Sequence, residues 1–176
     1  MATFTYGILG CGMMGGEHIR NIALLEDAAV AAIYEPDAAM SAASQALAPN
    51  AVMVASEQEL INFHDLDAIL IVSPNHCHAA QLEAINAARP DIAILVEKPL
   101  FTDQSDLARV TALKEKHKAP IWVAMEYRYM PPITALLERL QNATGGTKML
   151  TIREHRFPFL EKVGDWNRFN VNTGGT

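Results

Sequence analysis

The fold is decided by residues 4–15, which read FTYGILGCGMMG. The apolar run at 4–9 leads directly into a G-x-G-x-x-G pattern, and a helix-like stretch follows from Met13. A strand that turns through these glycines into a helix is the phosphate-binding element of dinucleotide-binding domains. Gly10 would permit the tight turn, Gly12 the approach of a pyrophosphate, and Gly15 close packing of helix on strand. We predict that a cofactor is bound by the residues of this loop, Gly10, Gly12, Met13, Met14 and Gly15.

Apolar runs that do not alternate with polar residues recur along the chain. They lie at 4–9, 29–34, 51–54, 68–72, 93–96 and 121–125. Strands buried on both faces have this composition. Helix-like stretches separate them at 13–25, 37–47, 75–88 and 103–117. This alternation predicts an α/β fold, a doubly wound Rossmann domain with a parallel sheet.

Helical spacing predicts which side chains the helices bury. One face of the first stretch carries Gly15, Ile19, Ile22 and Ala23, and the third carries Ala79, Leu82 and Ile85 behind a capping Asn75. The fourth opens with Asp103 and sets Leu107, Val110 and Leu113 on one stripe. These faces are expected to cover the sheet.

The pattern changes after residue 125. Pro132 fits the first turn of a helix that reaches about Asn142, Gly145-Gly146 would end it, and a strand is expected at 148–155. We predict a Rossmann domain at 1–128, then a linking helix and the start of an α+β substrate domain at 129–176. Because the last residues show neither helix nor strand pattern, we expect the chain to be truncated.

Composition excludes several classes of partner. The net charge is −6, so nucleic acid is not an expected partner. No apolar run approaches the roughly 18 residues of a membrane span, and the first residues do not resemble a signal peptide. Two cysteines, Cys11 and Cys77, lie far apart. We expect a cytoplasmic protein with free thiols and no membrane partner.

Glu35 lies 20 residues after Gly15, at the end of the second apolar run. An acidic side chain at this position accepts hydrogen bonds from the adenosine ribose hydroxyls. Its negative charge would also repel the 2′-phosphate of NADP, and no Arg or Lys follows nearby to attract that phosphate. The sequence therefore predicts NAD in preference to NADP.

Three later segments are expected at the carboxyl edge of the sheet, where ligands of this fold bind. They are Ser73-Pro74-Asn75-His76-Cys77-His78, Glu97-Lys98-Pro99 and Glu126-Tyr127-Arg128-Tyr129. With the glycine loop, these motifs resemble the glucose–fructose oxidoreductase / inositol dehydrogenase (Gfo/Idh/MocA) family. Trp166-Asn167-Arg168 and Gly174-Gly175 resemble its entry into a second domain.

The resemblance implies an NAD(P)-dependent oxidoreductase acting on sugars, inositols or related polyols, with a C-terminal domain built on an open antiparallel sheet. It implies that Glu97 contacts the nicotinamide-side ribose and that Lys98–Pro99 is a cis peptide. Ser73, Pro74, Asn75 and His78 would line the cofactor. The family's proton-transfer histidine belongs to an H-x-x-D segment that would follow Thr176. A homo-oligomer is expected for the full-length form.

Lys98 is the predicted catalytic residue on chemical grounds as well. Oxidation of an alcohol requires loss of the hydroxyl proton, and an ammonium beside that oxygen stabilises the developing alkoxide. Lys98 and Arg128 are also candidates for substrate binding, although Arg128 could equally bridge the two domains. For His78, a half-buried structural role is an equal alternative. No metal is expected, because His76-Cys77-His78 lacks a further ligand pair at a suitable spacing.

Two other functions remain open on the sequence. One is glycoside hydrolysis through transient oxidation by tightly held NAD, which some members of the family perform. The other is a non-catalytic NAD-binding module. Net production of NADH in the steady state would separate a dehydrogenase from the hydrolase.

Overall fold

The computed structural model describes residues 3–141, 144–146, 149 and 151 of the 176-residue chain. Its centre is a sheet of six strands in the order β3-β2-β1-β4-β5-β6, with every neighbouring pair parallel. The strands are β1 (Phe4–Leu9), β2 (Ala28–Tyr34), β3 (Val52–Met53), β4 (Ala68–Ile71), β5 (Ala93–Val96) and β6 (Ile121–Val123). This order is that of the doubly wound Rossmann fold. The predicted fold class of this domain is confirmed.

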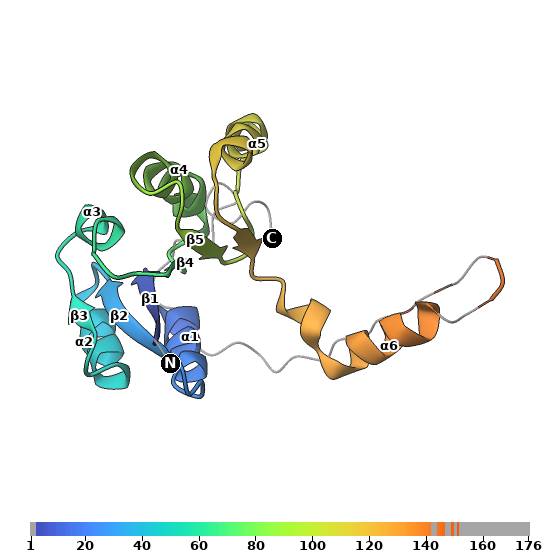
Figure 1. Ribbon diagram of the computed structural model, residues 1–176, viewed down its shortest axis with the longest axis horizontal. Coiled ribbons are helices and arrows are strands. Elements are labelled where there is room, and N and C mark those ends of the chain that lie inside the picture. The colour runs from blue at the N-terminus through green and yellow to red at the C-terminus, as the bar shows by residue number, and fades with distance from the viewer. Residues whose placement is uncertain (1–2, 142–143, 147–148, 150, 152–176) are drawn as a thin grey trace. The chain divides into compact units, whose positions relative to one another are not determined.

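Helices cover both faces of the sheet (Figure 1). The helices α1 (Met13–Ile22) and α2 (Ala38–Leu47) lie on one face. On the other lie α3 (Glu57–Ile61), α4 (His78–Ala88), which follows the 3-10 turn η1 (Asn75–Cys77), and α5 (Asp106–Lys116). No helix in the described part of the chain has the length and apolar character needed to cross a membrane.

Burial on both faces explains why the strands lack polar alternation. Successive residues of β1, Ile8 and Leu9, are fully buried in two different clusters. Ile8 packs with Ile19 of α1, whereas Leu9 belongs to the cluster that contains Leu82 of α4. The inner positions of the strands therefore meet a helix on one side or the other, and a polar residue there would lack water, whereas Phe4, Val52 and Trp122 are exposed.

The described part of the first compact unit ends at Ala124, and a second compact unit begins at Met125. It contains the 3-10 turn η2 (Glu126–Tyr129) and α6 (Pro131–Gln141). The helix predicted around Pro132 is present, with both prolines in its first turn. The strand expected at 148–155 and the motifs at 166–168 and 174–175 fall outside the described residues. The domain boundary at residue 128 stays a prediction.

Several local predictions need correction. The sequence analysis missed α3, although Ser56 and Glu59 form the S-x-x-E pattern of a helix start. Asn75 does not cap α4, because no side chain caps η1 or α4 and the turn begins after Pro74. Ala23 is exposed beyond the end of α1. Leu107 is 53% exposed, since its α5 stripe reaches the core only at Leu113.

Gly10 is placed where no other residue fits well. Its φ is +79°, in the left-handed region that favours glycine. A Cβ on this residue would lie 2.5 Å from the Cα of Ser73, which follows β4 closely. The backbone that leaves β1 therefore passes against the backbone that leaves β4.

We expect Gly10→Ala to lower the free energy of unfolding by about 1–3 kcal/mol, because strain in φ adds to a backbone clash. Gly16→Ala is the matched control. Gly16 lies in α1, and its added Cβ would meet Leu47 at an ordinary 3.5 Å. That change should leave stability unchanged or raise it by about 0.5–1 kcal/mol. Urea denaturation measures both, and equal stability of the two variants would contradict the account.

Candidate functional site

Four polar turns follow neighbouring strands at the carboxyl edge of the sheet. The glycine loop follows β1, Glu35 follows β2, Ser73 follows β4, and Glu97 follows β5. The strand order places β1 between β2 and β4, where the direction of winding reverses. Ligands of open α/β sheets bind outside this edge, at the reversal point. The topology thus brings the predicted site residues of the first unit to one edge.

The glycine loop leaves the first turn of α1 open to an anion. Gly12 is the N-cap, and in the described part of the chain no side chain caps the helix and no acidic residue lies in its first turn. A Cβ on Gly12 would meet only the sulfur of Met40, at 3.9 Å. Unpaired amides at a helix N-terminus attract phosphate, and the space beside Gly12 admits one. The residues present fit the pyrophosphate of a dinucleotide.

The remaining loop residues have different surroundings. A Cβ on Gly15 would lie 2.8 Å from the sulfur of Cys11, so this glycine is required by packing within the loop. Met13 is 70% exposed and Met14 is 41% exposed. Both methionines therefore present apolar surface at the turn, as expected of side chains that pack on a ligand.

The Glu35 carboxylate is held against the glycine loop. One oxygen accepts the amide of Cys11 at 2.5 Å, and the other accepts the amide of Asp37 at 2.9 Å. A carboxylate oxygen has a second lone pair, so both remain able to accept a hydroxyl. Spacing alone could place Glu35 at this edge, but the bond to Cys11 shows how its orientation is fixed.

The turn after β4 is built around polar contacts that point into the protein. The Ser73 hydroxyl donates to Oε1 of Gln81 at 2.5 Å, and the Gln81 amide donates to Glu57 at 2.7 Å. His78 is fully buried, with Nδ1 2.7 Å from the carbonyl oxygen of Pro99 and Nε2 2.9 Å from that of Ser73. Its ring nitrogens face backbone rather than the surface, so the structure favours a supporting role over the predicted direct contact with a cofactor.

Glu97, Lys98 and Pro99 follow β5, and the Lys98–Pro99 peptide bond is cis, as the resemblance implies. Glu97 is 8% exposed, whereas Lys98 is exposed. Nε2 of His18, in α1, lies 2.8 Å from Oε1 of Glu97, and the Lys98 amide donates to Oε2 at 3.2 Å. The sequence analysis missed His18, because no local pattern pairs residues 79 positions apart.

The environment of Glu97 favours its charged form. Burial by itself raises the pKa of this carboxyl group. The hydrogen bond and charge of His18, together with the amide and ammonium of Lys98, outweigh burial and lower the pKa below its ordinary value. Glu97 is therefore an ionised carboxylate at neutral pH, placed beside the lysine proposed for chemistry.

One predicted site residue is not joined to this edge by the structure. Arg128 lies in η2 of the second unit, so its contact with a substrate stays a prediction. Among the described residues, no group of three His, Cys, Asp or Glu side chains gathers as metal ligands.

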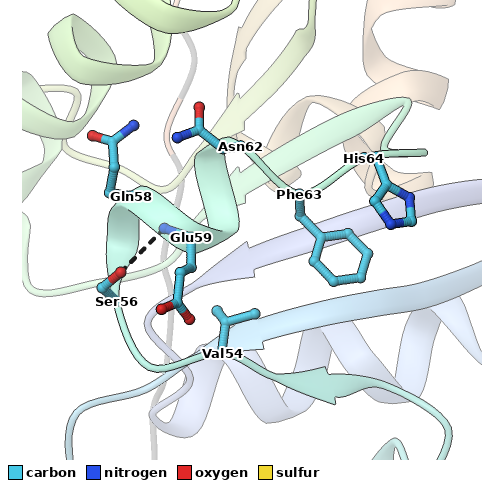
Figure 2. A pocket seen from close by; sticks show the side chains of 7 residues that line it. All are labelled: Val54, Ser56, Gln58, Glu59, Asn62, Phe63 and His64. Atoms are coloured by element: carbon cyan, nitrogen blue, oxygen red, sulfur yellow. Dashed lines mark hydrogen bonds between the residues drawn. The ribbon is translucent and has the colours of Figure 1, made fainter.

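A separate hollow lies beside α3 (Figure 2). Its lining residues are Val54, Ser56, Gln58, Glu59, Asn62, Phe63 and His64. Ser56 accepts the amide of Glu59 at 3.1 Å, and the Glu59 carboxylate accepts the amide of Ala55 at 2.8 Å. These bonds cap the short helix, so they explain the positions of Ser56 and Glu59 without a ligand.

Comparison with known proteins identifies the family. The model for the GFO_IDH_MocA oxidoreductase family, NAD-binding Rossmann fold, matches residues 4–125. The chain belongs to this family. The resemblance carried by the glycine loop and Glu97-Lys98-Pro99 is thereby confirmed.

Members of the Gfo/Idh/MocA family similar to this chain include inositol dehydrogenases. Inositol 2-dehydrogenase of Corynebacterium glutamicum (strain R) is 32% identical over 154 residues, covering 86% of this chain and 45% of that protein. The enzyme of the same name from Pseudarthrobacter chlorophenolicus is 32% identical over 172 residues, covering 97% and 50%. The chain thus spans about half the length of these relatives.

A solved structure of a myo-inositol dehydrogenase shares the fold. The Lactobacillus casei enzyme, in complex with NAD(H) and myo-inositol, superposes with a TM-score of 0.73 at 29% identity. The match covers 80% of this chain and 42% of the other. The chain is therefore similar to the half of such an enzyme that contains the Rossmann fold.

Proposed function

We propose that this chain supplies the NAD(H)-binding half, and the catalytic lysine, of a dehydrogenase that oxidises an inositol or a related polyol or sugar. One observation carries the proposal. The uncapped start of α1, the Glu35 carboxylate and the exposed Lys98 all follow strands at the same sheet edge. An anion site, a ribose acceptor and a cation for a reacting oxygen are what a nicotinamide-dependent dehydrogenase needs.

Each residue has a defined task in this proposal. The amides at the start of α1 hold the pyrophosphate, and Glu35 accepts the adenosine ribose hydroxyls. NAD supplies the hydride acceptor when it is bound. Lys98 stabilises the alkoxide that develops as the hydroxyl proton leaves, and Glu97, ionised and nearly buried, keeps a negative charge beside that ammonium.

Similarity supports the class of substrate. The relatives reported above are named inositol 2-dehydrogenases, and the Lactobacillus casei structure contains myo-inositol. Because the chain spans about half of these proteins, the second half would supply the wall opposite the nicotinamide and the proton-accepting histidine. Substrate choice is expected to depend mainly on that half.

The first prediction concerns cofactor choice. We expect the chain to bind NADH at least about tenfold more tightly than NADPH, because the Glu35 carboxylate repels a 2′-phosphate. Glu35→Gln keeps the size of the side chain and removes the charge, so it should reduce the difference between the affinities for NADH and NADPH. Calorimetric titration with both cofactors measures the two affinities.

Asp37→Asn is the control for charge in general. Asp37 caps α2 by accepting the amides of Ala39 and Met40, and asparagine caps equally well. The preference should survive in this variant. Equal affinities for NADH and NADPH in the unmutated chain would refute the assignment of Glu35.

The second prediction concerns Lys98. In a form extended to the length of the relatives, Lys98→Ala should lower turnover at least about 100-fold, because proton transfer and alkoxide stabilisation both weaken. Affinity for NADH should change less than about threefold, since phosphate and ribose contacts remain. Lys116→Ala, at an exposed lysine of α5, is the control and should leave turnover unchanged.

The assay follows NADH absorbance over a panel of inositols and sugars, with the 176-residue chain measured in parallel. The short chain should bind NADH without turnover, because positioning of the substrate contributes a large part of the rate. Strong turnover by the short chain, or full activity of Lys98→Ala, would show that the catalytic residues are elsewhere.

A further inference from the structure

The segment Glu97–Pro99 is held from two sides by histidines of two different helices. His18 of α1 reaches the Glu97 carboxylate at 2.8 Å. His78, the first residue of α4, reaches the carbonyl oxygen of Pro99 at 2.7 Å. The exposed Lys98 lies between these two attachment points. Neither contact is part of the cofactor or substrate binding described above.

The chemistry of the His78 contacts is restrictive. Both of its partners, the Ser73 and Pro99 carbonyl oxygens, can only accept hydrogen bonds. The ring therefore joins the turn after β4 to the turn after β5, with one contact to each.

Asparagine and glutamine cannot replace this bridge. They have both donor protons on one nitrogen, so they cannot reach two carbonyls on opposite sides. The ring has no exposed surface, so water cannot take the place of either carbonyl.

His18 completes the arrangement from the other face of the sheet. It is 19% exposed at its side chain, and its partner Glu97 is 10% exposed. The second Glu97 oxygen accepts the backbone amide of Lys98. Rotation of the Glu97 side chain would therefore release the amide of the residue that we assign to chemistry. Fixing the carboxylate fixes the start of the Lys98 backbone.

We propose that His18 and His78 are positioning residues that together set the orientation of Lys98. This inference rests on the proposed function of Lys98. It assigns the two histidines no contact with the reacting atoms. Loss of either should displace Lys98 and Glu97, and thereby weaken the nicotinamide half of the cofactor site while leaving the adenosine half unchanged.

His117 offers a matched control. It is also buried, and it also bridges two groups, the Asn86 side chain at 3.1 Å and the Ile92 carbonyl oxygen at 2.8 Å. Ile92 precedes β5, so this bridge lies at the opposite, amino end of the sheet. His117→Gln therefore reports the cost of losing a buried histidine bridge away from the site.

The experiment compares His18→Gln, His78→Gln and His117→Gln in the 176-residue chain. Affinities for NADH and for ADP, which lacks the nicotinamide half, are measured by calorimetry. The first two variants should lose about fivefold in NADH affinity, the effect of one hydrogen bond, and less than about twofold in ADP affinity. His117→Gln should leave the ratio of the two affinities unchanged.

One spectroscopic readout needs no nucleotide, so it separates this inference from the proposed function. Lysines are reductively methylated with ¹³C-formaldehyde, and the Lys98 signal is identified by Lys98→Arg. That signal should shift in His18→Gln and His78→Gln but not in His117→Gln.

The outcomes are decisive in either direction. A Lys98 signal that shifts in His18→Gln and His78→Gln supports the inference, even if no nucleotide binds and the proposed function fails. A Lys98 signal that stays unchanged in both variants overturns it.

Discussion

The backbone of Gly10 passes so close to that of Ser73 that a single added carbon would lie 2.5 Å from the Ser73 Cα. This contact joins the ends of β1 and β4, the two strands between which the sheet reverses its winding. Because Gly10 takes a φ of +79°, the chain can turn at once into α1 and present that helix's first amides at the sheet edge. The anion site, and every residue arranged around it, depends on this turn.

The polar residues of the edge are held by the loops of neighbouring strands rather than by their own elements. Glu35, after β2, accepts an amide of the loop after β1. Glu97, after β5, is bound by His18 of α1. His78 lies between the turns after β4 and β5. Buried charged groups are tolerated here because each has a partner, and such mutual contacts keep a site in one geometry before any ligand arrives.

Features that depend on local sequence were predictable, and those that depend on distant partners were not. The strands were found because both of their faces are buried, and the glycine loop with Glu35 because their spacing is local. The short α3 was missed, since five residues give too little periodicity. His18 could not be paired with Glu97 from sequence. Likewise, the buried ring of His78 contacts the carbonyl oxygen of Pro99, 21 positions away, and no local pattern indicates that contact.

The central claim is that the 176-residue chain binds NAD(H) at the turn between β1 and α1. Calorimetric titration of NADH into the chain and into Gly12→Val tests it most directly, because a Cβ at Gly12 meets only Met40 at 3.9 Å and the fold should tolerate it. Valine would occupy the space that a pyrophosphate must enter, so the account predicts at least about a tenfold loss of affinity, with Gly16→Ala binding normally. Equal NADH affinity in Gly12→Val and the unmutated chain would contradict the account.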